Sequence, residues 1–165
     1  KSEYHLLSQW PTSKCDERFG KVGLPENGPV AVEQNKAVFQ KMMNALNAKD
    51  LATLESLVDE DFVDNNAMPD MPANKEGMIN MMQMFVGAFP DLNITVNHWV
   101  AEGDLVVGVM TTEGTQTGEF MGMPASSKAF SVREMHMVRV ANGKMVEHWG
   151  LANELSMMQQ LGAMH

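Results

Sequence analysis

The chain of 165 residues has a hydrophobic content of 44% and a formal net charge of -9 at pH 7. This length fits one domain with a substantial core and is too short for two well-formed domains. The negative charge argues against nucleic acid and anionic membranes as partners, because both require clustered Lys and Arg. No apolar run reaches the length of about 18 residues that predicts a membrane-spanning helix.

Residues 1–30 are predicted to form an irregular N-terminal extension, because prolines and glycines interrupt any lasting period there. Residues 31–165 form the predicted domain. Cys15 is the only cysteine, so no internal disulfide is expected and the redox compartment stays open. Localisation is therefore open between the cytoplasm and, if a signal peptide was removed before Lys1, the periplasm or the exterior.

Three amphipathic helices are predicted in the first half of the domain. The first covers residues 32–46, where apolar side chains recur at helical spacing. Asp50 is the predicted N-cap of a short second helix, which the acidic run at residues 59–61 is expected to end. Asn74 is the predicted N-cap of a third helix, which Pro90 stops.

After Pro90 the apolar pattern changes from helical to alternating spacing. The alternation predicts strands at residues 94–100, 105–112, 115–120, 130–140 and 144–149, followed by a short helix at 154–161. Helices followed by a run of antiparallel strands are typical of the α+β class. We therefore expect a strongly curved antiparallel sheet wrapped around about three N-terminal helices.

The predicted strand at residues 130–140 carries two ionisable side chains, Glu134 and His136, within an apolar face. The two-residue period of a strand puts both on the face formed by Phe130, Val132, Val138 and Val140. Burying an unpaired ionisable group costs several kcal/mol, so this pair predicts a cavity lined by both side chains. Glu134 can either couple with His136 or pair with Arg133 or Arg139, and the sequence leaves both open.

A metal site is not expected at this strand. Glu134 and His136 supply at most two ligands, and no further His, Cys or carboxylate completes a set at a suitable spacing. His98 shares the predicted face of Ile94 and Val96 and is expected to have a structural role.

The segment from Met145 onward also alternates, which assigns its side chains to two faces. Glu147, Trp149 and Asn153 share the odd-numbered face with Met145. If that face lines the cavity, Trp149 forms a wall and Asn153 a polar contact. His148 then lies outside the cavity or at a dimer surface.

Several short segments carry a family resemblance. They are Ala88-Phe89-Pro90-Asp91-Leu92, Ala101-Glu102-Gly103-Asp104, the run from Gly114 to Gly122, His136-Met137-Val138-Arg139-Val140, Gly143-Lys144, Glu147-His148-Trp149 and Gln160-Leu161-Gly162. In this order and spacing, over roughly residues 33–163, the chain resembles the SnoaL-like polyketide cyclases or ester cyclases. These proteins belong to the nuclear-transport-factor-like folds.

The resemblance implies a cone-shaped α+β barrel whose open end holds a hydrophobic small molecule. It also implies a cofactor-free intramolecular aldol-type ring closure or a related isomerisation, so neither a cofactor nor a metal is expected. His136 lies where related proteins carry His or Asp, so it inherits the role of general acid and base, with Glu134 as its expected partner.

The chain departs from the family pattern at positions where related proteins often carry ionisable residues. Here Asn65, Gln116 and Asn153 are amides, with Gly150 close to the last. An amide orients a carbonyl group but does not exchange protons with it. The predicted pocket lining consists of these three amides with Trp149, Met110 and Phe85.

The sequence leaves three functions open. One is a cyclase or isomerase that uses His136, another is a non-catalytic carrier or sensor of a hydrophobic small molecule, and a third is a dimeric accessory protein. A homodimer is expected through the outer face of the sheet, where the amphipathic surface consists of Arg133, Met135, Met137 and Arg139.

Overall fold

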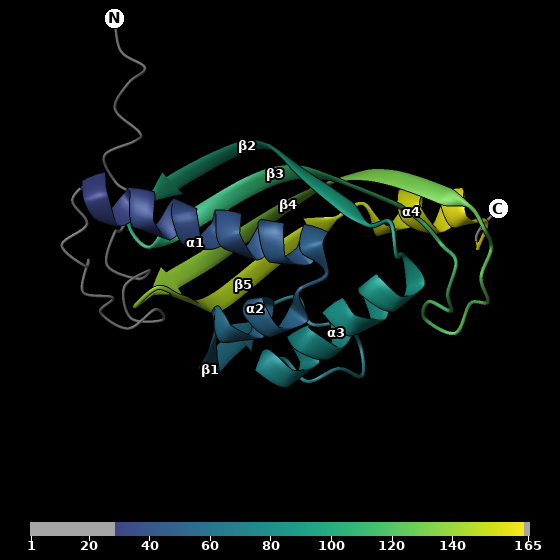
Figure 1. Ribbon diagram of the computed structural model, residues 1–165, viewed down its shortest axis with the longest axis horizontal. Helices are drawn as coiled ribbons and strands as arrows, with labels where there is room; N and C mark the ends of the chain where they lie inside the picture. Colours follow the sequence, from purple (N-terminus) through teal and green to yellow (C-terminus); the bar gives the residue numbers. More distant parts are fainter. Residues whose placement is uncertain (1–28, 164–165) are drawn as a thin grey trace, which may run out of the picture.

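The computed structural model describes residues 29–163, so the predictions for residues 1–28, including Cys15, lie outside the described part. Its helices and strands are, in chain order, α1 (Pro29–Ala48), α2 (Leu51–Ser56), β1 (Val58–Asp64), α3 (Lys75–Ala88), β2 (Asn93–Glu102), β3 (Leu105–Thr115), β4 (Ala129–Ala141), β5 (Lys144–Ala152) and α4 (Glu154–Leu161). In Figure 1, α1 crosses one face of the sheet, while α2 and α3 lie beside β1. Among the described helices, none is both long and apolar enough to cross a membrane.

The five strands form one curved sheet in the order β1-β5-β4-β3-β2. Neighbouring strands are antiparallel except for β1, which runs parallel to β5. Because β1 and β2 are both edge strands, the sheet is open and does not close into a barrel. The predicted α+β class, with a curved sheet and N-terminal helices, is confirmed. We call the face on which α1 packs the inner face.

Side-chain caps fix where two helices begin, as the sequence predicts. Asp50 Oδ1 accepts the backbone N–H of Thr53 at 2.9 Å at the start of α2. Asn74 Oδ1 accepts the N–H of Gly77 at 3.1 Å at the start of α3. Replacing such a cap by Ala typically costs about 1 kcal/mol, so both caps help to define the helix boundaries.

The acidic run at residues 59–61 does not end a helix, contrary to the prediction, but lies within β1. Val58 and Phe62 are buried on the inner face and hold this strand against the core. Asp and Glu are depleted in strands, which is why the pattern of this segment did not indicate one.

The prediction of a separate strand at residues 115–120 is also wrong, because β3 ends at Thr115 and no strand follows directly. Beyond it, the backbone N–H groups of Thr117 and Gly118 donate to the carbonyl oxygen of Ala88, at 2.9 and 3.1 Å. These two bonds attach the segment to the end of α3 rather than to another strand.

A bulge in β5 reverses the face of the residues that follow it. Val146 is the extra residue, because Met145 and Glu147 pair with neighbouring residues of β4. One extra residue moves every later side chain to the opposite face of the sheet. His148 therefore lies on the inner face, and Trp149 lies on the outer face.

A second bulge has the same effect in β2. Val96 pairs with Met110 and His98 pairs with Val109 in the strand register. Asn97 is therefore the extra residue, with no residue of β3 opposite it. The prediction that His98 shares the face of Val96 is therefore wrong, since His98 lies on the outer face and is exposed.

Two apolar clusters pack on the inner face. The larger cluster joins α1 to the sheet through side chains that include Phe39, Val106, Val138 and Met145. The smaller cluster joins α3 and α4 through side chains that include Phe89, Phe120, Val132 and Met157. Along β4, Glu134 and His136 lie between the two clusters. A fully buried large apolar side chain contributes about 1.5–3 kcal/mol to the stability of a fold. Glu134 and His136 therefore contribute less hydrophobic stabilisation at these two positions than apolar side chains would.

Candidate functional site

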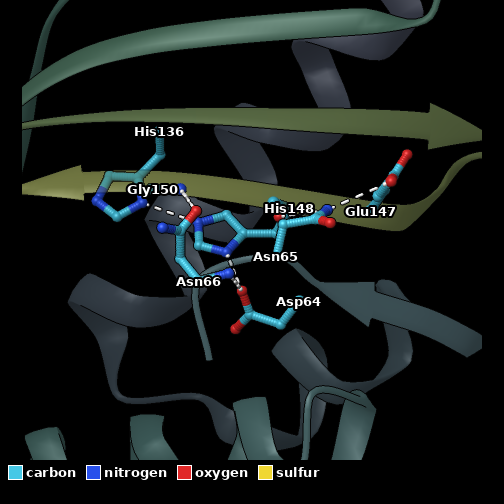
Figure 2. A network of polar contacts seen from close by, with 7 residues as sticks. All are labelled: Asp64, Asn65, Asn66, His136, Glu147, His148 and Gly150. Atoms are coloured by element: carbon cyan, nitrogen blue, oxygen red, sulfur yellow. Dashed lines mark hydrogen bonds and ion pairs between the residues drawn. The ribbon is translucent and has the colours of Figure 1, made fainter. Parts of the chain in front are cut away.

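Four ionisable side chains make a continuous series of polar contacts across the inner face. Asp64 Oδ1 lies 2.9 Å from His148 Nδ1, and His148 Nε2 lies 2.9 Å from His136 Nδ1 (Figure 2). His136 Nε2 lies 3.4 Å from Glu134 Oε2. We call Asp64, His148, His136 and Glu134 the polar row.

The members of the polar row differ in exposure. The side chain of Asp64 is 3% exposed and that of His148 is 14% exposed. The exposed fraction is 15% for Glu134 and 25% for His136. His136 is therefore the member most open to a small molecule on the inner face, while Asp64 stays shielded from it.

Thr112 of β3 extends the polar row by one neutral group. Its hydroxyl donates to Glu134 Oε2 at 2.8 Å, and its side chain is buried beside the strand that carries Glu134. The same carboxylate oxygen faces His136. Thr112 thus restricts the orientation of the carboxylate next to the imidazole.

The buried end of the row carries a negative charge. Burial acts to raise the pKa of Asp64, because a low-dielectric surrounding disfavours the charged form. The hydrogen bond with His148, the N–H of Asn66 at 3.0 Å and the charges of both imidazoles act in the opposite direction, so the pKa of Asp64 lies below its usual value. Asp64 is therefore an ionised acceptor at neutral pH.

Gly150 of β5 leaves the space in which the two imidazoles meet. A Cβ atom at this position would lie 3.0 Å from His136 Nδ1 and 3.2 Å from His148 Cε1. The Gly150 N–H also donates to Asn66 Oδ1 at 2.7 Å, which ties the segment after β1 to β5 (Figure 2). The planes of the two imidazoles differ by 16°.

The structure brings His136 and Glu134 together on the inner face, as the strand period predicts. Of the partners that the sequence left open for Glu134, it contacts His136. Arg139 instead pairs on the outer face with Asp104 at 2.8 Å and with Glu147 at 3.0 Å.

The prediction that His148 lies outside the cavity is wrong, because the bulge at Val146 turns it to the inner face. The same bulge turns Trp149 to the outer face. There its ring lies 5.8 Å from the guanidinium carbon of Arg139. Trp149 therefore forms no wall beside His136.

Two of the predicted pocket amides make structural contacts. The side-chain amide of Asn65 donates to the carbonyl oxygen of His148 at 3.1 Å and to Glu147 Oε1 at 3.3 Å (Figure 2). Asn153 is the N-cap of α4, where its Oδ1 accepts the N–H of Ser156 at 3.2 Å. Neither side chain contacts the polar row.

The third predicted amide, Gln116, braces the segment that connects β3 to β4. It is 1% exposed, and its Oε1 accepts the Ser126 hydroxyl at 2.7 Å. Its Nε2 donates toward the carbonyl oxygens of Gly118, Met123 and Pro124 at 3.2–3.3 Å. These contacts occupy both ends of the amide, so Gln116 lies apart from the polar row.

The two predicted apolar lining residues belong to the two clusters. Met110 is buried in the larger cluster and pairs with Glu134 across β3 and β4, which puts it beside the polar row. Phe85 packs against the smaller cluster, with its ring centroid 4.8 Å from that of Phe120.

Sequence reasoning missed Asp64, His148 and Thr112 as members of this network. Asp64 could have been found, because it lies two residues after the buried Phe62 and so shares its face once the strand is recognised. His148 could not, since nothing in the pattern indicates the bulge that precedes it.

Two hollows in the described surface lie away from the imidazoles. One of about 660 Å³ lies between α1 and the turn at Asn142 and Gly143. The other, of about 370 Å³, lies on the outer face and is bordered by Met135, Leu151 and Asn153, with Glu134 also in its lining. Asn153 thus borders an outer hollow rather than the inner face.

Comparison with protein families gives one match that covers most of the domain. The model of the SnoaL-like polyketide cyclases matches residues 36–161, from within α1 to the end of α4. A curated relative, aklanonic acid methyl ester cyclase DnrD of Streptomyces peucetius, is 32% identical over 60 residues. That alignment covers 36% of this chain and 41% of the relative, so it spans less than half of the relative's length.

Solved structures of similar proteins cover more of the chain. AclR from Streptomyces galilaeus is 30% identical, with a TM-score of 0.74 and coverage of 81% of this chain and 99% of that one. IdmH from Streptomyces antibioticus is 32% identical, with a TM-score of 0.68 and coverage of 78% and 99%.

Proposed function

The chain belongs to the SnoaL-like polyketide cyclase family, and we propose that it closes a ring in a hydrophobic carbonyl compound by a cofactor-free aldol-type reaction. In this proposal His136 is the general acid and base and Glu134 is its partner. The observation that carries the proposal is the contact of His136 Nε2 with Glu134 Oε2, in which His136 is the most exposed member of the polar row.

The proposed reaction needs one proton to move twice. His136 Nε2 removes a proton from the carbon beside a carbonyl group, and the electron pair of that C–H bond becomes an enolate. The enolate carbon then bonds to a second carbonyl carbon of the same molecule, whose π electrons become an alkoxide. The alkoxide takes the proton from His136, so the product is an isomer of the substrate.

The surroundings of the row favour an apolar and uncharged substrate. The apolar clusters flank Glu134 and His136 on both sides along β4. Two carboxylates, Asp64 and Glu134, lie at the ends of the row. Because like charges repel in a partly buried site, a ketone or an ester is favoured over a free acid.

The three amides that were expected to line the pocket do not favour a carrier over an enzyme. Asn65, Gln116 and Asn153 are engaged in contacts within the protein. Asp64 and His148 form an ionisable pair next to His136. A proton-active set therefore adjoins His136, which supports an enzyme over a binding protein.

The proposal is tested with aklanonic acid methyl ester as the probe. Wild type should convert it to a product of the same mass, and His136→Ala should lower the rate by about 10²-fold or more. His98→Ala is the matched control, because His98 is exposed on the outer face, and its rate should stay within about twofold. Full activity of His136→Ala, or no conversion and no thermal stabilisation of wild type by the ester, contradicts the proposal.

We also propose a homodimer that forms through the outer face of the sheet. Leu151 is 73% exposed and Met135 is 46% exposed on this face, beside the hollow of about 370 Å³. Contiguous exposed apolar side chains mark interaction surfaces, and a second copy would cover them symmetrically.

A further inference from the structure

We infer that His148 and Asp64 are positioning residues, which hold His136 with its proton on Nδ1 and leave Nε2 as the nitrogen that exchanges protons with the substrate. This inference rests on the proposed function and deepens it. It names the reacting atom of His136, and it assigns a task to two side chains that never touch the substrate.

The direction of the hydrogen bonds follows from the buried end of the row. Asp64 is an ionised carboxylate and has no proton to donate, so the 2.9 Å contact needs a proton on His148 Nδ1. In the form of the row in which His148 is neutral, this is its only N–H, so His148 Nε2 has a free lone pair. That lone pair faces His136 Nδ1 at 2.9 Å.

The contact between the imidazoles fixes the tautomer of His136. With a lone pair on His148 Nε2, His136 Nδ1 must carry the proton, because two lone pairs at 2.9 Å would repel each other. The near-parallel ring planes, 16° apart, allow this N–H to point at its acceptor. When His136 is neutral, its only free lone pair therefore lies on Nε2.

Nε2 is the ring nitrogen of His136 that does not contact His148. It faces Glu134 Oε2 at 3.4 Å, a longer contact than the other two of the row. A proton held on Nε2 can be donated to this carboxylate oxygen, which leaves Nε2 with the lone pair that a base needs.

No cationic side chain of the described residues competes for these positions. The titratable groups that contact His136 are His148 and Glu134, and Asp64 lies behind His148. Arg139 of the same strand is engaged on the outer face with Asp104 and Glu147. The proton order along the row is thus set by Asp64.

The first test reads the tautomer without any substrate. Protein labelled with ¹⁵N at histidine is examined by long-range ¹H–¹⁵N correlation NMR over a pH series, which distinguishes protonated from bare ring nitrogens. Wild type should show neutral His136 with its proton on Nδ1. Asp64→Asn should shift the proton toward Nε2, because an amide can present N–H to His148 and reverse the order. Asp61→Asn, with its exposed side chain on the same strand, should match wild type.

The spectrum of wild type overturns the inference if it shows neutral His136 with its proton on Nε2. An unchanged tautomer in Asp64→Asn overturns it as well. If Asp64→Asn does not fold, His148→Gln replaces it, and the same shift of the His136 proton is expected.

The second test reads the kinetics with aklanonic acid methyl ester. Asp64→Asn should lower kcat by about 10- to 100-fold with KM within about twofold, because a positioning residue acts on the reacting group rather than on binding. A variant whose KM rises by this factor while its kcat stays at the wild-type value contradicts the inference. Wild type without activity, but with the expected tautomer, contradicts the proposed function alone.

Discussion

The imidazoles of His136 and His148 meet at 2.9 Å, from Nδ1 of one to Nε2 of the other, although the strand pattern assigns them to opposite faces. The bulge at Val146 makes this contact possible, because it turns His148 to the inner face. Gly150 completes it by leaving the space between the rings free. The central chemical feature of the protein therefore depends on two backbone details of β5.

Gly150→Ala should separate the two imidazoles. Its Cβ would lie 3.0 Å from His136 Nδ1, closer than about nine in ten real contacts of a Cβ atom, so the ring must shift by a few tenths of an ångström. A misplacement of about 1 Å costs about 10²-fold in rate where geometry controls catalysis, and this smaller shift costs less. We expect ring closure to fall by up to about tenfold, with thermal unfolding changed by only a few degrees, measured on the same preparation.

Gly87→Ala is the matched control for this variant. A Cβ at Gly87 in α3 meets no atom within 4 Å, and Ala should stabilise a helix interior by about 0.5–1 kcal/mol. If Gly150→Ala keeps the wild-type rate, the contact between the imidazoles has no part in catalysis.

Asp64→Asn should lower stability in a pH-dependent manner. The pKa of Asp64 lies below the ordinary Asp value of about 3.9 in the folded protein, so its ionised form stabilises the fold. This contribution is fully present above that ordinary value and is lost as pH falls through the folded pKa. Urea unfolding should find the variant about 1–3 kcal/mol less stable than wild type at pH 7, with the difference shrinking below about pH 4.

Asp61→Asn serves as the control, because Asp61 is exposed on the same strand. Its free energy of unfolding should follow that of wild type at every pH. A difference between Asp64→Asn and wild type that grows toward acid would contradict the direction of the Asp64 shift.

Gln116→Leu should destabilise the fold without acting on the reaction. Its buried amide bridges the Ser126 hydroxyl and several backbone carbonyl oxygens, and unsatisfied buried groups cost about 1–3 kcal/mol each. We expect the urea midpoint to fall while kcat of the remaining folded enzyme stays within about twofold. A variant with unchanged stability and lost activity would return Gln116 to the pocket, where the sequence analysis put it.

Leu151→Glu should dissociate the proposed homodimer. Leu151 is 73% exposed on the outer face, and a charge there would be buried without a partner in the interface. Light scattering after size exclusion should give a dimer for wild type and a monomer for the variant. Leu155→Glu is the control, since Leu155 is 56% exposed on α4. A monomeric wild type would refute the proposal.

Much of the fold was predictable because its signals are local. Asp50 and Asn74 mark the starts of α2 and α3 through side-chain caps, and alternation along β4 places Glu134 and His136 on the inner face. These features depend on neighbours within a few residues, which is the range that pattern analysis covers.

The rest of the site depends on features without a local signal. The bulges at Val146 and Asn97 change which face later residues occupy, and a strict two-residue period cannot register an inserted residue. β1 was hidden by its acidic side chains, so Asp64 was not placed beside His148. The family resemblance did not reveal Asp64 either, because it indicated Asn65, the next residue, as a pocket residue.

The proposed reaction requires His136 to move a proton at a carbon next to a carbonyl group. The most direct measurement is deuterium uptake from D₂O into that carbon of an aromatic ketone that lacks a second carbonyl, so that exchange occurs without ring closure. Wild type and His98→Ala should exchange at similar rates, and His136→Ala should fall by about 10²-fold or more. Exchange by His136→Ala at the wild-type rate would contradict the claim.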